Sequence, residues 1–371
     1  MNLSYWEINS WLTNIDFTIV GSGIVGLNCA LQLKEKFPKS NIVILERGML
    51  PQGASTKNAG FTCFGSLSEI LDDLQFHSEE VVFKLVKKRV NGLKLLRKTL
   101  GDKVIKYKNY GGYELFSQTD SALFETCLSE RERINNMLYP IFKNPVFSLK
   151  NNAFNFKNIK NQYVFNSFEG QIDTGMMMEA LLQKTISKGI KILNNITVES
   201  FLETTNKVKI KTDRFELSTS KLLIATNGFA SQLLNEQVKP ARAQVLITKP
   251  IKGMPIKGTF HLDKGYYYFR NVENRILLGG GRNLDFIGEE TTSLNQTDLI
   301  QNKLEDLLGH MILSDIPFEI AHRWSGIMGV GNQKKAIVKS ISDKVFCGVR
   351  LGGMGIAIGS IIGNELAQLI D

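Results

Sequence analysis

The chain has 371 residues, of which 43% are hydrophobic and 22% charged, and 45 Lys and Arg residues against 36 Asp and Glu residues give a formal net charge of +9. This composition excludes disordered and collagen-like chains, and the length predicts about two domains with a core that needs no disulfides. The four cysteines lie far apart without a C-x-x-C pair. We therefore expect reduced thiols rather than a zinc knuckle or a redox dithiol.

The distribution of charged and apolar residues bears on partners and location. Lysines are scattered and interleaved with acids, whereas nucleic-acid-binding proteins usually cluster their positive charge. The N-terminus, Met1 to Glu7, lacks a basic start followed by an apolar run, and the apolar stretch 351–363 is shorter than the ~20 residues that span a bilayer. We predict a cytoplasmic protein with no membrane span and no nucleic-acid partner.

Three segments alternate between strand and helix patterns. Near the N-terminus, an apolar strand at 16–20, a glycine turn, a helix over 24–37 and an apolar strand at 41–46 make a βαβ unit. The later patterns are a helix from Asp173 to about 186, a strand at 190–193, a hairpin of 207–211 and 215–217, strands at 222–225 and 345–349, and a helix over about 355–370.

The two intervening regions are richer in aromatic and β-alternating residues, for example at 266–269. We therefore predict an α/β fold with a discontinuous Rossmann-like nucleotide-binding domain, in which helices cover a parallel sheet, and a β-rich substrate domain. The first domain comprises 12–100, 171–235 and 325–371, and the second comprises 101–170 and 236–324.

The strongest motif is the glycine turn Gly21-Ser22-Gly23-Ile24-Val25-Gly26, which follows a strand and opens a helix. Glu46 stands at the end of the second strand, at the spacing of a dinucleotide-binding fingerprint. Gly21 permits the turn, Gly23 lets the backbone approach a pyrophosphate and Gly26 allows close helix–strand packing. Glu46 is expected to accept hydrogen bonds from ribose hydroxyls. The alternative is a glycine-rich turn beside a surface acid.

The next motif carries a family resemblance. Gly53-Ala54-Ser55-Thr56-Lys57-Asn58-Ala59-Gly60-Phe61 resembles a GAS-x-(R/K)-N-(A/G)-G loop of the D-amino-acid oxidase, glycine oxidase and sarcosine oxidase superfamily of FAD enzymes. The resemblance implies that Ser55 and Thr56 face phosphate and that Ala59 and Gly60 approach the isoalloxazine. The alternative is an ordinary polar loop, since small residues and Asn are common in turns.

Three later segments extend this resemblance over essentially the whole chain. The segment 195–198 is similar to one whose valine backbone contacts adenine, 224–228 resembles a strand end beside the cofactor, and 352–356 resembles a glycine loop facing the flavin pyrimidine. The predicted cofactor-binding residues are Gly21, Ser22, Gly23, Ile24, Val25, Gly26, Glu46, Arg47, Ala54, Ser55, Thr56, Asn58, Ala59, Gly60, Val198, Ala225, Thr226, Gly228, Arg350, Gly352, Gly353, Met354, Gly355 and Ile356. We expect FAD to bind non-covalently, because neither Cys63 nor Cys347 lies in a motif that matches covalent attachment.

The substrate site departs from the family pattern. Met328 stands where the glycine-oxidase branch has a carboxylate-binding arginine, and Ala357 stands where sarcosine oxidases have a lysine. The candidate replacement cations are Arg270, Arg282, Arg323 and Arg350. Tyr266 matches a tyrosine of the glycine-oxidase pocket. We assign Tyr266, Arg270 and Arg323 to catalysis, with packing and surface ion pairs as the alternative role of each arginine.

No metal site and no histidine-linked nucleophile is predicted, because His77, His261, His310 and His322 fit no metal or triad spacing.

The predicted activity is oxidation of a C–N bond in a small amine or amino acid by hydride transfer to flavin N5, with oxygen or another molecule as electron acceptor. Three alternatives remain open: an FAD-dependent 2-hydroxy-acid dehydrogenase, a flavin-dependent tRNA-modifying oxidase and a non-catalytic nucleotide-binding protein.

Overall fold

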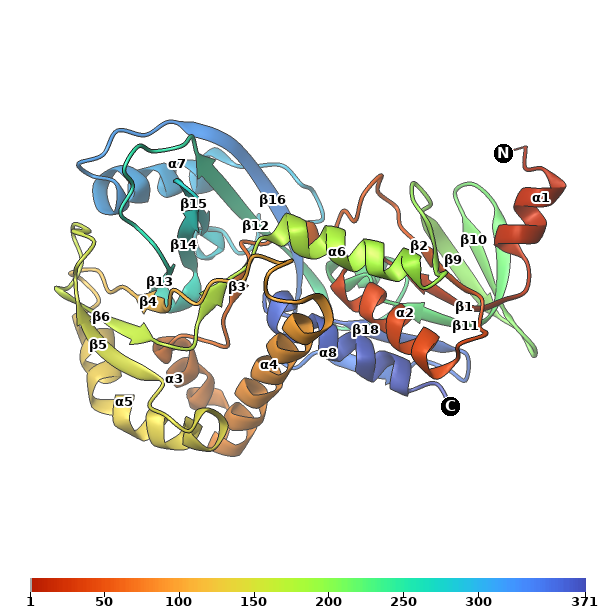
Figure 1. The fold of residues 1–371 in the computed structure, drawn as a ribbon, viewed down its shortest axis with the longest axis horizontal. Helices are drawn as coiled ribbons and strands as arrows, with labels where there is room; N and C mark the ends of the chain where they lie inside the picture. The colour runs from red at the N-terminus through yellow and green to blue at the C-terminus, as the bar shows by residue number, and fades with distance from the viewer. Residues whose placement is uncertain (1) are drawn as a thin grey trace.

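The computed structural model describes residues 2–371, which form two lobes, each built around a large sheet (Figure 1). In the first lobe the strand order is β17-β18-β11-β1-β2-β8. The strands are β1 (Ile15–Val20), β2 (Ile42–Leu45), β8 (Lys191–Leu193), β11 (Glu216–Ile224), β17 (Ile337–Ser340) and β18 (Val345–Val349), with β9 (Val198–Glu203) and β10 (Val208–Thr212) attached beside β11. The pairs among β18, β11, β1, β2 and β8 are parallel, whereas β17 is antiparallel to β18.

Helices cover this parallel sheet because its strands are apolar on both faces, as in β1 and β2. The covering helices include α2 (Ile24–Lys36), α6 (Thr174–Ser187) and α8 (Gly355–Gln368), which lie together in Figure 1. Helices α2 and α8 approach closely at Gly363, where an added Cβ would lie 2.6 Å from the carbonyl oxygen of Val25. A larger side chain at this position would push the two helices apart.

The second lobe holds a mixed sheet with the strand order β16-β12-β15-β14-β13-β4-β6-β5. Its strands are β4 (Gly112–Glu114), β5 (Phe147–Asn151), β6 (Gln162–Asn166), β12 (Lys239–Thr248), β13 (Thr259–Leu262), β14 (Tyr267–Val272), β15 (Arg275–Gly280) and β16 (Ile320–Val330). Phe260 and Phe269 stack in its core with ring centroids 4.4 Å apart. The helices of this lobe and its border are α3 (Leu67–Phe76), α4 (Glu79–Leu100), α5 (Ser121–Phe142) and α7 (Asp298–Leu307).

Two features differ from the sequence-based expectation. The region 101–170 contains the long helix α5 beside its strands, because apolar residues such as Phe124, Ile134 and Leu138 form one buried face. The predicted boundary between segments 236–324 and 325–371 falls within strand β16, which pairs with β12 from Ile320 to Val330.

The remaining short elements are α1 (Tyr5–Glu7), η1 (Ile8–Leu12), η2 (Ala54–Thr56), β3 (Phe61–Thr62), β7 (Gly170–Gln171), η3 (Asn227–Gln232), η4 (Asp263–Gly265), η5 (Arg282–Leu284) and η6 (Leu308–Ile312). Within residues 2–371, no helix combines the length and the apolar character needed to cross a membrane.

Candidate active site

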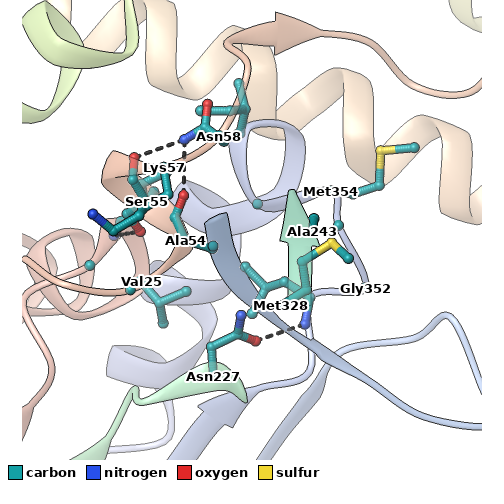
Figure 2. A pocket seen from close by; sticks show the side chains of 18 of the residues that line it. Val25, Ala54, Ser55, Lys57, Asn58, Asn227, Ala243, Met328, Gly352 and Met354 are labelled. Carbon is teal, nitrogen blue, oxygen red and sulfur yellow. Dashed lines mark hydrogen bonds between the residues drawn. The ribbon is translucent and has the colours of Figure 1, made fainter. Parts of the chain in front are cut away.

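A cavity of about 470 Å³ runs from the carboxyl ends of β1, β2 and β11 to β13 and β14 of the second sheet. Figure 2 shows part of its wall, with Ser55 and Asn58 on one side of the view and Met328 and Met354 on the other. The volume lies in the range of small-molecule and cofactor sites. Both lobes contribute residues to its lining.

The glycine turn brings backbone amides to one end of the cavity. Gly21 has φ +102°, and an added Cβ would lie 2.9 Å from the carbonyl oxygen of Ala225. The first amide of α2, at Ile24, donates to the Ser55 hydroxyl at 3.0 Å. This arrangement places a helix N-terminus and a side-chain hydroxyl together, which suits an anion such as a pyrophosphate.

Glu46 is buried beside this turn. Its Oε2 accepts hydrogen bonds from the Ser22 amide at 3.0 Å and from the Ser22 hydroxyl at 2.8 Å, and its Oε1 accepts from the Gly48 amide at 3.0 Å. Glu46 still lines the cavity, whereas Ser22 does not. Ser22, which the sequence analysis predicted to bind the cofactor, therefore holds the carboxylate in place and does not form the cavity wall.

Arg47 also lies at this end, with its guanidinium carbon 3.7 Å from the ring centroid of Phe229. Burial lowers the pKa of Arg47, and the neighbouring Glu46 opposes this shift. The stacked guanidinium and ring form a flat wall for a planar group.

The loop after β2 is held by its own asparagine. The Asn58 amide donates to the carbonyl oxygens of Ala54 at 3.2 Å and Ser55 at 2.8 Å (Figure 2). Its Oδ1 accepts from the Gly60 amide at 2.9 Å. Thr56 differs from the expectation: its hydroxyl donates to the Pro51 carbonyl at 2.6 Å and it does not line the cavity.

The turn before α8 and the end of β11 form the neighbouring wall. Asn227 accepts a hydrogen bond from the Leu351 amide at 3.1 Å, which fixes the glycine loop that precedes α8. Thr226 lines the cavity, and its hydroxyl is buried without a partner among residues 2–371. Such an orphaned hydroxyl fits a bound group that supplies the missing hydrogen bond.

Most predicted cofactor-binding residues meet at this cavity. The lining residues among them are Gly21, Gly23, Ile24, Val25, Glu46, Arg47, Ala54, Ser55, Asn58, Ala59, Gly60, Val198, Ala225, Thr226, Gly352, Gly353, Met354, Gly355 and Ile356. Gly26 and Gly228 lie behind the wall, where an added Cβ would approach the Gly21 carbonyl oxygen to 2.0 Å and the Met328 carbonyl oxygen to 2.6 Å. These two glycines allow close packing and leave the cavity surface to their neighbours.

The predicted catalytic arginines do not line the cavity, although Tyr266 does. Arg270 is buried and donates to the carbonyl oxygens of Ala59 and Ile172, and burial lowers its pKa to about 10. Arg323 donates to Gln301 at 2.6 Å and to Glu305 at 2.7 Å. Both arginines are therefore committed to protein oxygens.

Arg350 lies outside the cavity as well. Its guanidinium donates to the carbonyl oxygens of Lys335 and Gln237, at 3.0 Å and 3.4 Å respectively. It holds the chain around β17 and does not reach the predicted cofactor position.

The half of the cavity bordered by η4 and η5, named the substrate half, contains two lysines that the sequence did not single out, together with Arg282, one of the predicted candidate cations. Lys264 pairs with Asp72 at 3.0 Å, and Lys334 pairs with Asp73 of the same helix, α3. Arg282 also lines this half, and no ion pair within residues 2–371 involves it. Burial lowers the pKa of Arg282, but a guanidinium remains charged near neutral pH.

Arg282 is positioned by aromatic residues. Its guanidinium carbon lies 4.8 Å from the ring centroid of Phe286, and the Phe286 ring contacts Tyr266 edge-on at 5.8 Å. The site therefore offers a cation whose orientation depends on stacking and whose hydrogen-bond donors are available to a ligand.

His261 and Glu169 form a third pair that the sequence did not predict, with His261 Nε2 at 2.5 Å from Glu169 Oε1. Burial disfavours the imidazolium, but Glu169, together with Glu69 and Glu114, outweighs this effect and raises the pKa of His261 to about 9. His261 lines the cavity. The sequence offered no signal for this pair, because its members are 92 positions apart.

The parallel sheet with its glycine turn, facing a mixed sheet across the cavity, defines a class of two-lobed dinucleotide-binding oxidoreductases. A family model described as FAD dependent oxidoreductase (DAO) matches residues 16–369, and the chain belongs to this family. The predicted resemblance and enzyme class are thus confirmed. FAD is the cofactor of the family, and the glycine turn, the helix N-terminus and the orphaned Thr226 hydroxyl fit it.

Individual relatives are distant in sequence. The chain is 20% identical to "Probable oxidoreductase OrdL" of Haemophilus influenzae, over 97% of this chain and 83% of that protein. Two similar solved structures are L-proline dehydrogenase from P. horikoshii (TM-score 0.73, 18% identity, 96% of this chain and 93% of that chain) and glycine oxidase from Geobacillus kaustophilus (TM-score 0.73, 16% identity, 96% and 95%). These likenesses confirm the predicted α/β fold class.

Proposed function

We propose that the protein oxidises a C–N bond of a small amine or amino acid, with FAD held in the cavity described above. When bound, FAD supplies an acceptor at N5 for the hydride of the substrate. In this proposal the segments 12–100, 171–235 and 325–371 bind the cofactor, and the segments 101–170 and 236–324 bind the substrate. The family membership and the amino-acid enzymes among the similar structures support this assignment.

The observation that carries the proposal is the unpaired guanidinium of Arg282 in the substrate half. A carboxylate binds a guanidinium through charge-assisted, often bidentate hydrogen bonds. Arg282 therefore replaces Arg270 and Arg323 as the proposed anchor for the carboxylate of an amino acid, with Tyr266 beside it. The anchor is needed to orient the reacting carbon, since positioning is the main task of the protein in cofactor-dependent oxidation.

Apolar residues define the rest of the reaction space. Met328, which stands where the glycine-oxidase branch has an arginine, and Met354 of the glycine loop before α8 both line the cavity (Figure 2). Their thioether side chains exclude water and adapt to irregular ligand shapes. We therefore propose that they pack against the substrate and the cofactor instead of binding charge.

Non-covalent cofactor binding is supported by the state of the cysteines. Cys63 lines the cavity, but burial and the nearby Glu169 and Glu69 raise its pKa well above the ordinary value. Burial also raises the pKa of Cys347 to about 11. Because the thiolate is the nucleophile in such attachments, both side chains are poorly suited to form a covalent bond to the flavin.

Acid precipitation of the protein tests this proposal. It should release all of the yellow flavin into the supernatant, and a yellow protein pellet would contradict non-covalent binding.

The activity is tested by adding donors to the purified yellow protein without oxygen. The panel contains glycine, sarcosine, L-proline and D-alanine as amines, and glycolate and D-lactate as 2-hydroxy acids. Loss of the visible flavin absorption with an amine supports the proposal. Loss only with the hydroxy acids would favour the dehydrogenase alternative, and no response to either class would contradict both. Readmission of oxygen, compared with an artificial dye, then identifies the class of electron acceptor.

A further inference from the structure

A buried histidine–glutamate pair occupies the substrate half of the cavity. His261 belongs to β13 and Glu169 precedes β7, and their side chains are only 6% and 1% exposed. The 2.5 Å contact engages Nε2 of the imidazole. Within residues 2–371, the other ring nitrogen, Nδ1, has no hydrogen-bond partner. It is not among the fully buried polar atoms that lack a partner, and His261 lines the cavity, so Nδ1 is accessible from there.

Glu169 is held firmly in place. The Thr259 hydroxyl donates to its Oε1 at 2.8 Å, and an added Cβ at Gly112 would lie 2.3 Å from its Oε2. The carboxylate therefore has little freedom to leave the imidazole. This rigidity fixes which nitrogen of His261 faces Glu169 and which nitrogen is left for the cavity.

The pair also lies next to the predicted flavin loop. The imidazole contacts the ring of Phe61 edge-on, with centroids 5.3 Å apart, and Phe61 directly follows Gly60 of that loop. Tyr268 is opposite His261 in the β13–β14 pairing and contacts the same Phe61 ring at 5.7 Å. Burial raises the pKa of Tyr268 to about 12, so its hydroxyl stays neutral. His261 is thus the group next to the loop whose charge can change.

The charged surroundings favour the protonated ring. Glu69 of α3 and Glu114 of β4 face His261 in addition to Glu169, and the Cys63 thiol nearby stays neutral. Glu114 is itself held by the Ser66 and Ser68 hydroxyls. A proton on His261 is therefore stabilised by three carboxylates, and the neutral ring that can accept a proton becomes abundant as the pH approaches about 9.

We propose that His261, positioned by Glu169, accepts the proton that the substrate loses from its reacting nitrogen. In this step the ammonium N–H bond breaks, an N–H bond forms at Nδ1 of His261, and the electron pair stays on the substrate nitrogen. Nothing is oxidised or reduced, and the Nε2 proton remains hydrogen-bonded to Glu169. The step rests on the proposed function, because only a neutral amine can release its hydride readily. His261 is a catalytic residue here and Glu169 is a positioning residue.

The first test uses the flavin-loaded protein labelled with 15N and 13C in its histidines. The chain has four histidines. One of them should titrate near pH 9, and this signal should be missing in His261→Gln. In Glu169→Gln the same signal should titrate lower by roughly 1–3 pH units, because an opposite charge has been removed. Ordinary titration of all four histidines would overturn the proposal, and this readout does not depend on any substrate.

The second test measures flavin reduction by the amine of the panel that bleaches the flavin fastest, as a function of pH. His261→Gln should slow reduction on the order of 10²-fold near pH 9, where the neutral imidazole and the ammonium form of the amine coexist. The deficit should shrink at pH values where most of the amine is already unprotonated, because no protein base is then needed. Glu169→Gln should move the rising limb of the profile to lower pH.

The matched control is His322→Gln. His322 is exposed on β16, stacks on Trp324 at 5.8 Å and does not line the cavity. This variant should keep the wild-type profile. If His261→Gln also keeps that profile, the pair has only a structural role. If His261→Gln fails to fold, the test rests on Glu169→Gln. A rising limb of the pH profile that stays at the wild-type pH in Glu169→Gln would then overturn the proposal. Absence of any bleaching would contradict the proposed function while leaving the histidine titration interpretable.

Discussion

The hydroxyl of Ser55 accepts a hydrogen bond of 3.0 Å from the amide of Ile24, the first residue of α2. Two segments that are 31 positions apart are thereby joined at the point where the predicted pyrophosphate is expected. Gly23 directly precedes Ile24, and an added Cβ there would come within 2.8 Å of the Ser55 hydroxyl oxygen. The close contact makes cofactor binding sensitive to a single methyl group.

We therefore expect Gly23→Ala to lose FAD. Overpacking of about 1–3 kcal/mol at the binding surface would weaken FAD affinity roughly 10- to 100-fold. The ratio of visible to ultraviolet absorption after purification measures the retained cofactor. Gly309→Ala is the control, because its added Cβ meets no atom within 4 Å and Gly309 does not line the cavity. Full flavin content in Gly23→Ala would contradict the assigned pyrophosphate position.

Arg282→Met should weaken substrate binding without abolishing turnover. Loss of hydrogen bonds to a charged group costs about 1.5–3 kcal/mol, so KM for an amino acid should rise roughly 10- to 100-fold. The control is Arg323→Met, since Arg323 bonds Gln301 and Glu305 outside the cavity. Steady-state kinetics on both variants separate the two arginines. A larger KM increase in Arg323→Met would restore the sequence-based assignment.

Substitutions of two adjacent glutamates should affect the stability of the fold very differently. Glu289 Oε1 lies 2.6 Å from Arg242 Nη2, and the side chains of Glu289 and Arg242 are only 1% and 7% exposed. Glu289→Leu leaves a buried guanidinium uncompensated, which should lower the free energy of unfolding by about 3–5 kcal/mol. Glu290→Leu breaks only the exposed pair with Lys239 and should cost less than about 1 kcal/mol. Urea denaturation distinguishes them, and equal losses would refute the argument.

The pH dependence of stability should reflect His261. Its folded-state pKa, raised to about 9, exceeds the unfolded value of about 6.5, so the folded state holds a proton more tightly. This contribution is complete below about pH 6.5 and is lost as the pH rises through about 9. The difference in Tm between wild type and His261→Gln should therefore be largest in acid and shrink above pH 9. A difference that grows with pH would contradict the sign.

The local motifs could be predicted because their residues are close together in the sequence. The βαβ unit, the glycine turn and Glu46 depend on apolar periodicity, on backbone freedom at Gly21 and on a short spacing, and the structure brings them to one cavity. The helix α5 was not predicted, although its buried residues, such as Phe124, Ile134 and Leu138, lie on one helical face.

The amino-acid sequence alone determined the fold class, the family and the cofactor-binding turn, since these are encoded in contiguous patterns. Only the tertiary structure decided that Arg282 faces the cavity while Arg270 and Arg323 bond to protein oxygens. It also decided that His261 meets Glu169. These outcomes depend on packing between strands and loops that are distant in the chain. The residue type of an arginine or histidine does not reveal which acidic or carbonyl group will pair with it in the folded protein.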